Sequence, residues 1–200
     1  MKNNLLVCGG VPRGGTTYLF TELSNYNNTF KSLIKESHVF YRDSNFIKKK
    51  IDKLKPNKIY LDFTPDYFFN INILSYLKTN SINSFFIIRD FDSWNISINN
   101  YLKINKIDDK YFLNMKKSHY LKCQHFIEKN FLTFHFNELK NIDLIKNNIE
   151  KKFNIDFGIK VNNKEKYNSS NIRSHFLLSF LRTYFRKEEI ILKSKLFGLI

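Results

Sequence analysis

The chain has 200 residues, 42% of them hydrophobic, which provides enough apolar side chain for the core of one domain. Its two cysteines and five histidines show no spacing typical of a disulfide framework or a zinc site, so we expect neither, and no metal. The net charge of +15 suits an anionic ligand but also fits lysines spread over solvated faces. No run of about 18 apolar residues occurs, so we expect one cytoplasmic domain over 1–200 without a membrane span.

Short apolar segments alternate with longer amphipathic stretches along the chain. This pattern is typical of an α/β domain with a mostly parallel central sheet. Strands are predicted at 4–8, 58–63, 84–89 and 131–136. Helices are predicted at 16–25, 43–54, 70–79, 92–105, 109–129, 138–152 and 173–197, with a long loop at 158–172.

A glycine-rich stretch, which we call the glycine loop (10–17), lies between the first predicted strand and the first helix. Gly10 and Gly15 have the spacing of the ATP- and GTP-binding pattern G-x-x-x-x-G-K-[ST], but Thr16 stands in place of its lysine. Glycines let backbone N–H groups approach an anion, and the positive end of the following helix dipole attracts it. Arg13 supplies a cation from inside the loop instead. The alternative is a turn that serves tight packing only.

The sequence VPRGGTTYL at 11–19 resembles the 5′-phosphosulfate loop of sulfotransferases that use 3′-phosphoadenosine 5′-phosphosulfate (PAPS). The resemblance implies a P-loop NTPase-like sulfotransferase fold with three layers, PAPS as the cofactor and 3′,5′-adenosine bisphosphate as its product. It also implies cofactor contacts from five residues of the loop: Arg13, Gly14, Gly15, Thr16 and Thr17.

A second stretch, FFIIRDFDSWNIS at 85–97, resembles the 3′-phosphate site of the same family. There, an arginine at a strand end and a serine about two turns into the next helix hold the phosphate; Arg89 and Ser97 match them. A guanidinium can donate two parallel hydrogen bonds to a phosphate, and a hydroxyl can add another. Alternatively, Arg89 pairs with Asp90 or Asp92 at the surface and the serine is incidental.

Two further stretches, KESHVFY at 35–41 and LDFTPDYFF at 61–69, resemble the E-x-H-x-F and T-P-x-Y segments of the heparan sulfate sulfotransferases. The resemblance implies that Glu36 is the general base for the acceptor hydroxyl and that His38 is an alternative base or orients the glutamate. Arg13 would stabilise the charge that develops on the sulfuryl group.

The residue patterns also allow simpler interpretations of the proposed base. Glu36 could be a surface carboxylate paired with Lys35 or Arg42, and His38 could be a packed or exposed histidine. A glutamate close to cations is a weak base unless it is partly desolvated, so its function depends on local burial.

The chain also departs from the glycan-modifying branch. Arg13 replaces the usual lysine of the loop, Phe63 replaces a lysine before T-P, and Tyr41 stands where an aspartate is common. No Lys-Gly-Arg stretch occurs near 160–172. Towards the C-terminus, FLTFHFNEL at 131–139 and the stretch that follows the long loop resemble late segments of bacterial sulfotransferases.

We therefore predict a PAPS-dependent sulfotransferase that acts on a hydroxyl of a small-molecule or glycan acceptor and binds no nucleic acid. One alternative is a P-loop kinase-like enzyme that uses ATP, which the missing lysine disfavours. Another is a basic nucleic-acid-binding module, which only the charge supports.

Overall fold

The computed structural model describes residues 4–30, 35–42 and 58–161, together with residues 47, 49, 51 and 54. All of them belong to one unit of the chain, Met1–Val161. The predicted helix at 173–197 lies outside the described residues, as do most of the predicted helix at 43–54 and most of the predicted loop at 158–172.

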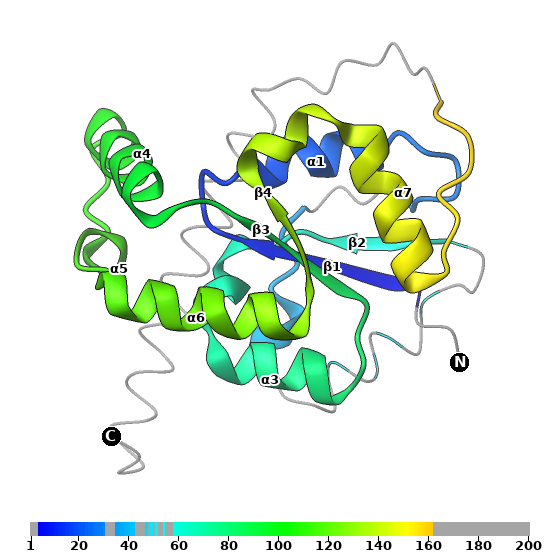
Figure 1. Cartoon of the computed structure of the whole chain (residues 1–200), viewed down its shortest axis with the longest axis horizontal. Helices are drawn as coiled ribbons and strands as arrows, with labels where there is room; N and C mark the ends of the chain where they lie inside the picture. Colours follow the sequence, from blue (N-terminus) through cyan, green and yellow to red (C-terminus); the bar gives the residue numbers. More distant parts are fainter. Residues whose placement is uncertain are drawn as a thin grey trace. The chain divides into compact units, whose positions relative to one another are not determined.

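Four parallel strands form the central sheet (Figure 1). Their order across the sheet is β2 (Tyr60–Asp62), β1 (Leu5–Gly10), β3 (Ser84–Ile88) and β4 (Leu132–His135). All four predicted strands and the parallel sheet are confirmed. Because β1 lies inside the sheet, its Val7 is in register with a residue of β2 on one side and a residue of β3 on the other.

The strands read as continuous apolar runs because both faces of the sheet are covered. Side chains alternate along a strand, so Leu5 and Val7 of β1 join one buried cluster while Leu6 and Cys8 join another. The aromatic and branched residues of β3 divide between the two clusters in the same way. The core therefore consists of two layers separated by the sheet.

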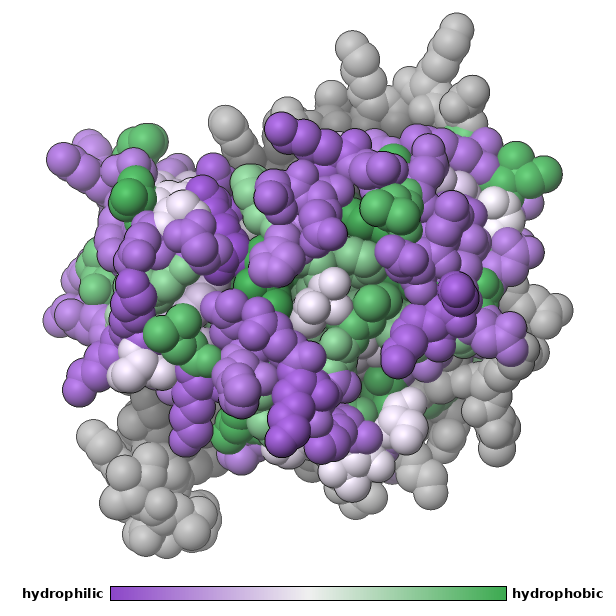
Figure 2. Space-filling view, in the orientation of Figure 1, coloured by the Kyte–Doolittle hydropathy of each residue, from purple (hydrophilic) through white to green (hydrophobic). Residues whose placement is uncertain are grey.

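Helices cover both of these layers, as Figure 1 shows. The face with Leu6 is covered by α1 (Thr16–Leu23) and α7 (Ile142–Phe153), and the opposite face by α3 (Ile71–Thr79) and α6 (Lys117–Asn130). The predicted three-layer α/β architecture is confirmed. Hydrophilic residues cover most of the face seen in Figure 2, with hydrophobic ones between them.

The prediction of one helix over 109–129 is wrong. The chain forms α5 (Lys110–Leu113) and α6, with an extended residue immediately before α6. The break allows the rings of Phe112 and Tyr120 to pack on Trp94, with centroids 6.3 and 5.1 Å away. The spacing of apolar residues within 109–129 cannot predict a contact with a helix elsewhere in the chain, so it did not predict the break.

The helix predicted at 138–152 begins later than expected. Asn141 caps α7 by accepting a hydrogen bond from the backbone of Leu144, and a short 3₁₀ helix, η3 (Phe136–Lys140), precedes it. An asparagine that caps a helix sets the start of that helix.

The order of the strands places a topological switch point between β1 and β3. The chain leaves β1 for β2 by way of α1 on one face, and it leaves β3 for β4 by way of α6 on the other face. In open parallel sheets, ligands bind where such connections diverge, at the carboxyl ends of the strands. Here that point is the carboxyl ends of β1 and β3, where the glycine loop and α4 (Phe91–Ile104) begin.

Close contact between β1 and β3 underlies this arrangement and can be tested at Gly9. A Cβ atom on Gly9 would lie 2.1 Å from Cε1 of the fully buried Phe86. We expect Gly9→Ala to lower the free energy of unfolding by about 1–3 kcal/mol, measured by urea denaturation, because the overlap is with a packed ring.

The matched control for this overlap is the double variant with Phe86→Leu, which removes the ring. Gly9→Ala should cost clearly less in the Phe86→Leu background than in the wild-type chain. Equal costs in the two backgrounds would show that the overlap is not the cause.

Candidate functional site

The glycine loop leaves β1 in a tight turn, in which the Gly14 backbone N–H donates to the carbonyl of Val11 at 2.8 Å. α1 then begins at Thr16, and among the described residues no side chain caps its N-terminus. The N–H groups of its first turn therefore point towards the carboxyl edge of the sheet. This is the arrangement by which backbone groups and a helix dipole attract an anion.

Gly15 is required by its position in the loop. Its φ angle is 85°, in the left-handed region, and a Cβ atom there would lie 2.3 Å from Cδ1 of Leu139 and 3.3 Å from Cε2 of Phe136. η3 therefore packs directly against the start of α1. This contact comes from residues more than a hundred positions away, and sequence analysis did not assign Phe136 to the site.

α4 holds the other side of the glycine loop. Nε1 of the buried Trp94 donates to the carbonyl oxygen of Pro12 at 3.0 Å. The guanidinium of the exposed Arg13 lies over the ring of Tyr101, 5.0 Å from its centroid. Arg13 also has a φ angle of 65°, which is uncommon for a residue other than glycine.

Arg89 contacts the glycine loop directly. Its Nη1 donates to the carbonyl oxygen of Arg13 at 3.0 Å, and its Nε donates to Oγ of Ser93 at 3.3 Å. Its guanidinium also lies 4.7 Å from the ring centroid of Phe136. Tyr120 fixes the arginine backbone by donating to its carbonyl. The two predicted phosphate-binding segments, 76 residues apart in sequence, are therefore adjacent.

The alternative of a surface ion pair for Arg89 does not describe the structure. Asp90 caps α4 by accepting from the backbone of Ser93 at 2.8 Å, and Asp92 pairs with Lys117 at 2.9 Å. The hydrogen bonds from Ser93 lower the pKa of Asp90. In the described part of the chain, Asp90 is therefore hydrogen-bonded to Ser93, and Asp92 to Lys117. The nearby charge of Arg89 also lowers the pKa of Asp90 to a smaller extent.

Ser97, which sequence analysis assigned to the 3′-phosphate, lies half-buried on α4. The serine that touches the guanidinium is Ser93, one turn nearer the strand. Sequence analysis missed it, although an aspartate such as Asp90 at the start of a predicted helix is a typical N-cap, which brings the residue three positions later close to it. The role of Ser97 stays a prediction.

Glu36 and His38 lie at the carboxyl end of β2. Oε1 of Glu36 is 2.7 Å from Nζ of Lys35, and its Oε2 is 3.7 Å from Nε2 of His38. Nδ1 of His38 faces Oδ2 of Asp66 at 3.8 Å. Only 11–14% of each of these side-chain surfaces is exposed. The Lys35 pair is therefore present, as the simpler interpretation held, but it is largely buried.

The buried carboxyl group of Asp62 connects the segment that carries Glu36 and His38 with the segment that carries Thr64, Asp66 and Tyr67. It accepts hydrogen bonds from the backbone of Ser37 at 3.2 Å, from Oγ1 of Thr64 at 2.6 Å and from the hydroxyl of Tyr67 at 2.9 Å. Burial raises the pKa of Asp62, while the hydrogen bonds from Thr64, Ser37 and Tyr67 act in the opposite direction. Sequence analysis gave Asp62 no role.

Residues 35–42, which we call the Glu36 segment, lie near β1, the strand that the glycine loop follows. Cys8, buried on β1 two residues before Gly10, lies within electrostatic range of Lys35 and Asp62. Burial raises the pKa of its thiol, with Lys35 opposing and Asp62 adding to the rise. Along the carboxyl edge of the sheet, the Glu36 segment therefore lies beside the end of β2, the glycine loop follows β1, and Arg89 follows β3.

Two solved structures resemble most of this chain. The crystal structure of a sulfotransferase from Alicyclobacillus acidocaldarius has a TM-score of 0.57 and 12% identity over 96% of each chain. The sulfotransferase domain from the curacin biosynthetic pathway has a TM-score of 0.53 and 14% identity over 78% of this chain and 75% of its own. The chain has the sulfotransferase fold. Its sequence matches no protein-family model and no curated protein.

No helix in the described part of the chain combines the length and the apolar composition that a membrane span requires. No group of three or more His, Cys, Asp or Glu side chains among the same residues could hold a metal ion.

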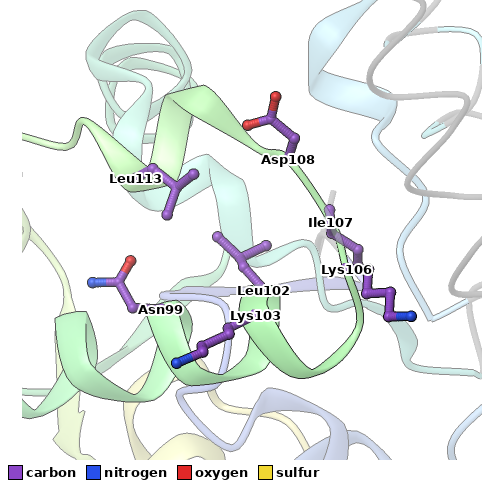
Figure 3. A pocket seen from close by; sticks show the side chains of 7 residues that line it. All are labelled: Asn99, Leu102, Lys103, Lys106, Ile107, Asp108 and Leu113. Atoms are coloured by element: carbon purple, nitrogen blue, oxygen red, sulfur yellow. The ribbon is translucent and has the colours of Figure 1, made fainter.

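An open hollow of about 310 Å³ lies near the far end of α4 (Figure 3). Its lining comes from α4, α5 and the connection between them: Asn99, Leu102, Lys103, Lys106, Ile107, Asp108 and Leu113. With a rise of about 1.5 Å per helical residue, Lys103 is about 15 Å along α4 from Ser93. The lining nevertheless begins at Asn99, two residues from Ser97, and Tyr101 beside Leu102 contacts Arg13 of the glycine loop.

The backbone constraint at the glycine loop gives a stability prediction. Gly15→Ala should lower the free energy of unfolding by at least about 2 kcal/mol, because the left-handed φ angle and the overlap with Leu139 both oppose a Cβ atom. Urea denaturation measures the change. Thr17→Ala, at an exposed position in the same segment, should change stability by less than about 0.5 kcal/mol. Similar losses for both variants would contradict the constraint.

Proposed function

We propose that this chain is a PAPS-dependent sulfotransferase that transfers a sulfuryl group to an acceptor hydroxyl. The observation that best supports the proposal is the hydrogen bond between Nη1 of Arg89 and the carbonyl of Arg13. It joins the two turns that would bind the two ends of one doubly phosphorylated adenosine. The sulfotransferase fold adds support at the level of architecture.

The residues at this edge fit such a nucleotide. The glycine loop, the uncapped start of α1 and the exposed Thr17 would hold the 5′-phosphosulfate, with Arg13 as a cation beside it. Arg89 uses Nε and Nη1 in its described hydrogen bonds, so Nη2 remains to donate to the 3′-phosphate, since a guanidinium has five N–H donors. Ser97 is our proposed second donor to that phosphate.

When bound, PAPS supplies the sulfuryl group and a phosphate leaving group. Sulfuryl transfer resembles phosphoryl transfer in depending on positioning and charge stabilisation. Glu36 would accept the proton of the acceptor hydroxyl, and His38, between Glu36 and Asp66, would orient it or replace it as the base. Lys35, which sequence analysis did not assign to catalysis, supplies a cation next to Glu36, in addition to Arg13 in the glycine loop.

We further propose that the acceptor is a glycan or another polar small molecule rather than a nucleic acid. The acceptor side of the site would be the segment around Glu36, Asp66 and Tyr41, where carboxylates and an aromatic ring lie together: the His38 and Tyr41 ring centroids are 6.0 Å apart. Carboxylates facing the acceptor would repel phosphates of a nucleic acid. An ATP-dependent reaction has less support, because the buried Thr16 takes the place of the phosphate-binding lysine.

Removal of the Arg89 side chain tests the nucleotide assignment. Arg89→Ala should weaken the binding of 3′,5′-adenosine bisphosphate by about 10- to 100-fold, the scale of hydrogen bonds to a charged group. The loss of affinity for 5′-AMP should be at least ten times smaller than the loss for the bisphosphate. 5′-AMP has no 3′-phosphate, so it is affected only through the lost contact between Arg89 and the carbonyl of Arg13. Isothermal titration calorimetry measures both affinities.

A matched control and a competing ligand make this test decisive. Lys129→Ala, which removes an exposed cation on α6, should leave both affinities unchanged. Equal losses for the two nucleotides in Arg89→Ala would count against the 3′-phosphate assignment. Tighter binding of ATP with magnesium than of the bisphosphate would favour the kinase-like alternative instead.

Replacement of the proposed base tests the mechanism. Glu36→Gln should lower kcat by about 10²- to 10⁴-fold, the usual contribution of general-base catalysis, with little change in bisphosphate affinity. The assay is transfer from PAPS to the acceptor that the wild-type enzyme uses, chosen from a panel of sugars and phenols. If Glu36→Gln kept its turnover while His38→Gln lost it, the histidine would be the base.

A further inference from the structure

A single buried carboxyl group, that of Asp62, anchors the backbone of the segment that carries Glu36 and His38. Asp62 ends β2 and is 2% exposed, and the two hydroxyl groups that connect it to this segment belong to Thr64 and Tyr67, which are both fully buried. A buried carboxyl group is unfavourable unless it accepts hydrogen bonds, and this one accepts three.

The direction of each hydrogen bond follows from the chemistry of the donors. A backbone N–H can only donate, so Oγ1 of Thr64 accepts from the backbone of His38 at 3.4 Å and donates its own proton to Asp62 at 2.6 Å. In the same way, the Tyr67 hydroxyl accepts from the backbone of Phe40 at 3.3 Å and donates to Asp62 at 2.9 Å. Hydrogen bonds connected in this way polarise and strengthen one another.

Three backbone N–H groups of one short segment therefore depend on Asp62. Ser37 donates to it directly, and His38 and Phe40 donate through the two hydroxyls. His38 has a φ angle of 49°, a left-handed conformation that costs a non-glycine residue about 1–2 kcal/mol. Such a conformation persists only where the surrounding structure enforces it.

The two residues that carry these hydroxyl groups also flank Asp66 in the chain. Thr64 immediately precedes η2 (Pro65–Phe69), and Tyr67 lies within it. His38 faces carboxylate oxygens of Glu36 and Asp66 at 3.7 and 3.8 Å. Asp62 thus connects the backbone on both sides of this imidazole.

We propose that Asp62 is a positioning residue, which sets the orientation of Glu36 and His38 at the acceptor through Thr64 and Tyr67. This inference rests on the proposed function. An apolar residue at position 62 would serve the core alone, as Leu61 and Phe63 do on either side. The carboxyl group is explained by the three N–H groups that it fixes.

The first test measures the backbone without any substrate. In ¹⁵N-labelled protein, Thr64→Val should speed amide hydrogen exchange of His38 by tenfold or more and change that of Phe40 less. Tyr67→Phe should do the reverse, and Asp62→Asn should affect both. Thr64→Ser, which keeps the hydroxyl, should match the wild-type chain, as should amides of α7 in every variant. Unchanged exchange in all three variants would overturn the proposal.

The second test separates positioning from simple stabilisation. Thr64→Val and Asp62→Asn should lower kcat tenfold or more, with the bisphosphate affinity within about threefold of the wild-type value, and Thr64→Ser should restore turnover. In a Glu36→Gln background, Thr64→Val should cause little further loss, because both changes act on the same step.

Two other outcomes would distinguish a failure of the positioning role from a failure of the proposed function. Faster exchange with an unchanged kcat would overturn the positioning role and leave a structural one. If the wild-type chain neither bound the bisphosphate nor transferred a sulfuryl group, the proposed function would fail, and the exchange rates alone would decide whether Asp62 holds the segment. Thr64→Val replaces the hydroxyl group by a methyl group, and Thr64→Ser removes the methyl group and keeps the hydroxyl. This pair of variants therefore tests the proposal even if Asp62→Asn does not fold.

Discussion

The site depends on one contact between two turns, the hydrogen bond from Arg89 to the carbonyl of Arg13. Parallel strands bring the ends of β1 and β3 to the same edge, and this bond brings their following turns into contact there. Trp94 and Phe136 then support the loop and the guanidinium from α4 and η3. A chain with the same strands but without this contact would keep its fold, and the glycine loop and Arg89 would not be joined.

Much of the fold could be predicted because its causes are local. The strands are short apolar runs, and the left-handed angle at Gly15 requires a glycine in the loop. The glycine loop and Arg89 were assigned from their resemblance to the two phosphate-binding segments of the sulfotransferases. In the structure each follows a strand of the parallel sheet, so both lie at the same edge.

The rest of the site depends on contacts between distant segments. The break between α5 and α6 reflects packing on Trp94, and Phe136 reaches the glycine loop from beyond β4. Asp62 looked like an ordinary strand residue, because its role exists only where residues 37–40 fold against it. Ser93 was overlooked in favour of Ser97 because the family pattern specifies a spacing and not a contact.

The hydrogen bond from Trp94 to Pro12 has a thermodynamic consequence for ligand binding. Together with the contacts from Arg89 and η3, it fixes the glycine loop in the folded protein before any nucleotide arrives. The conformational entropy of the loop is then lost during folding, so association itself requires little further ordering of the backbone. The proposed nucleotide, if bound to this loop, would also stabilise α4 and η3, so that saturation would protect three sequence-distant segments together.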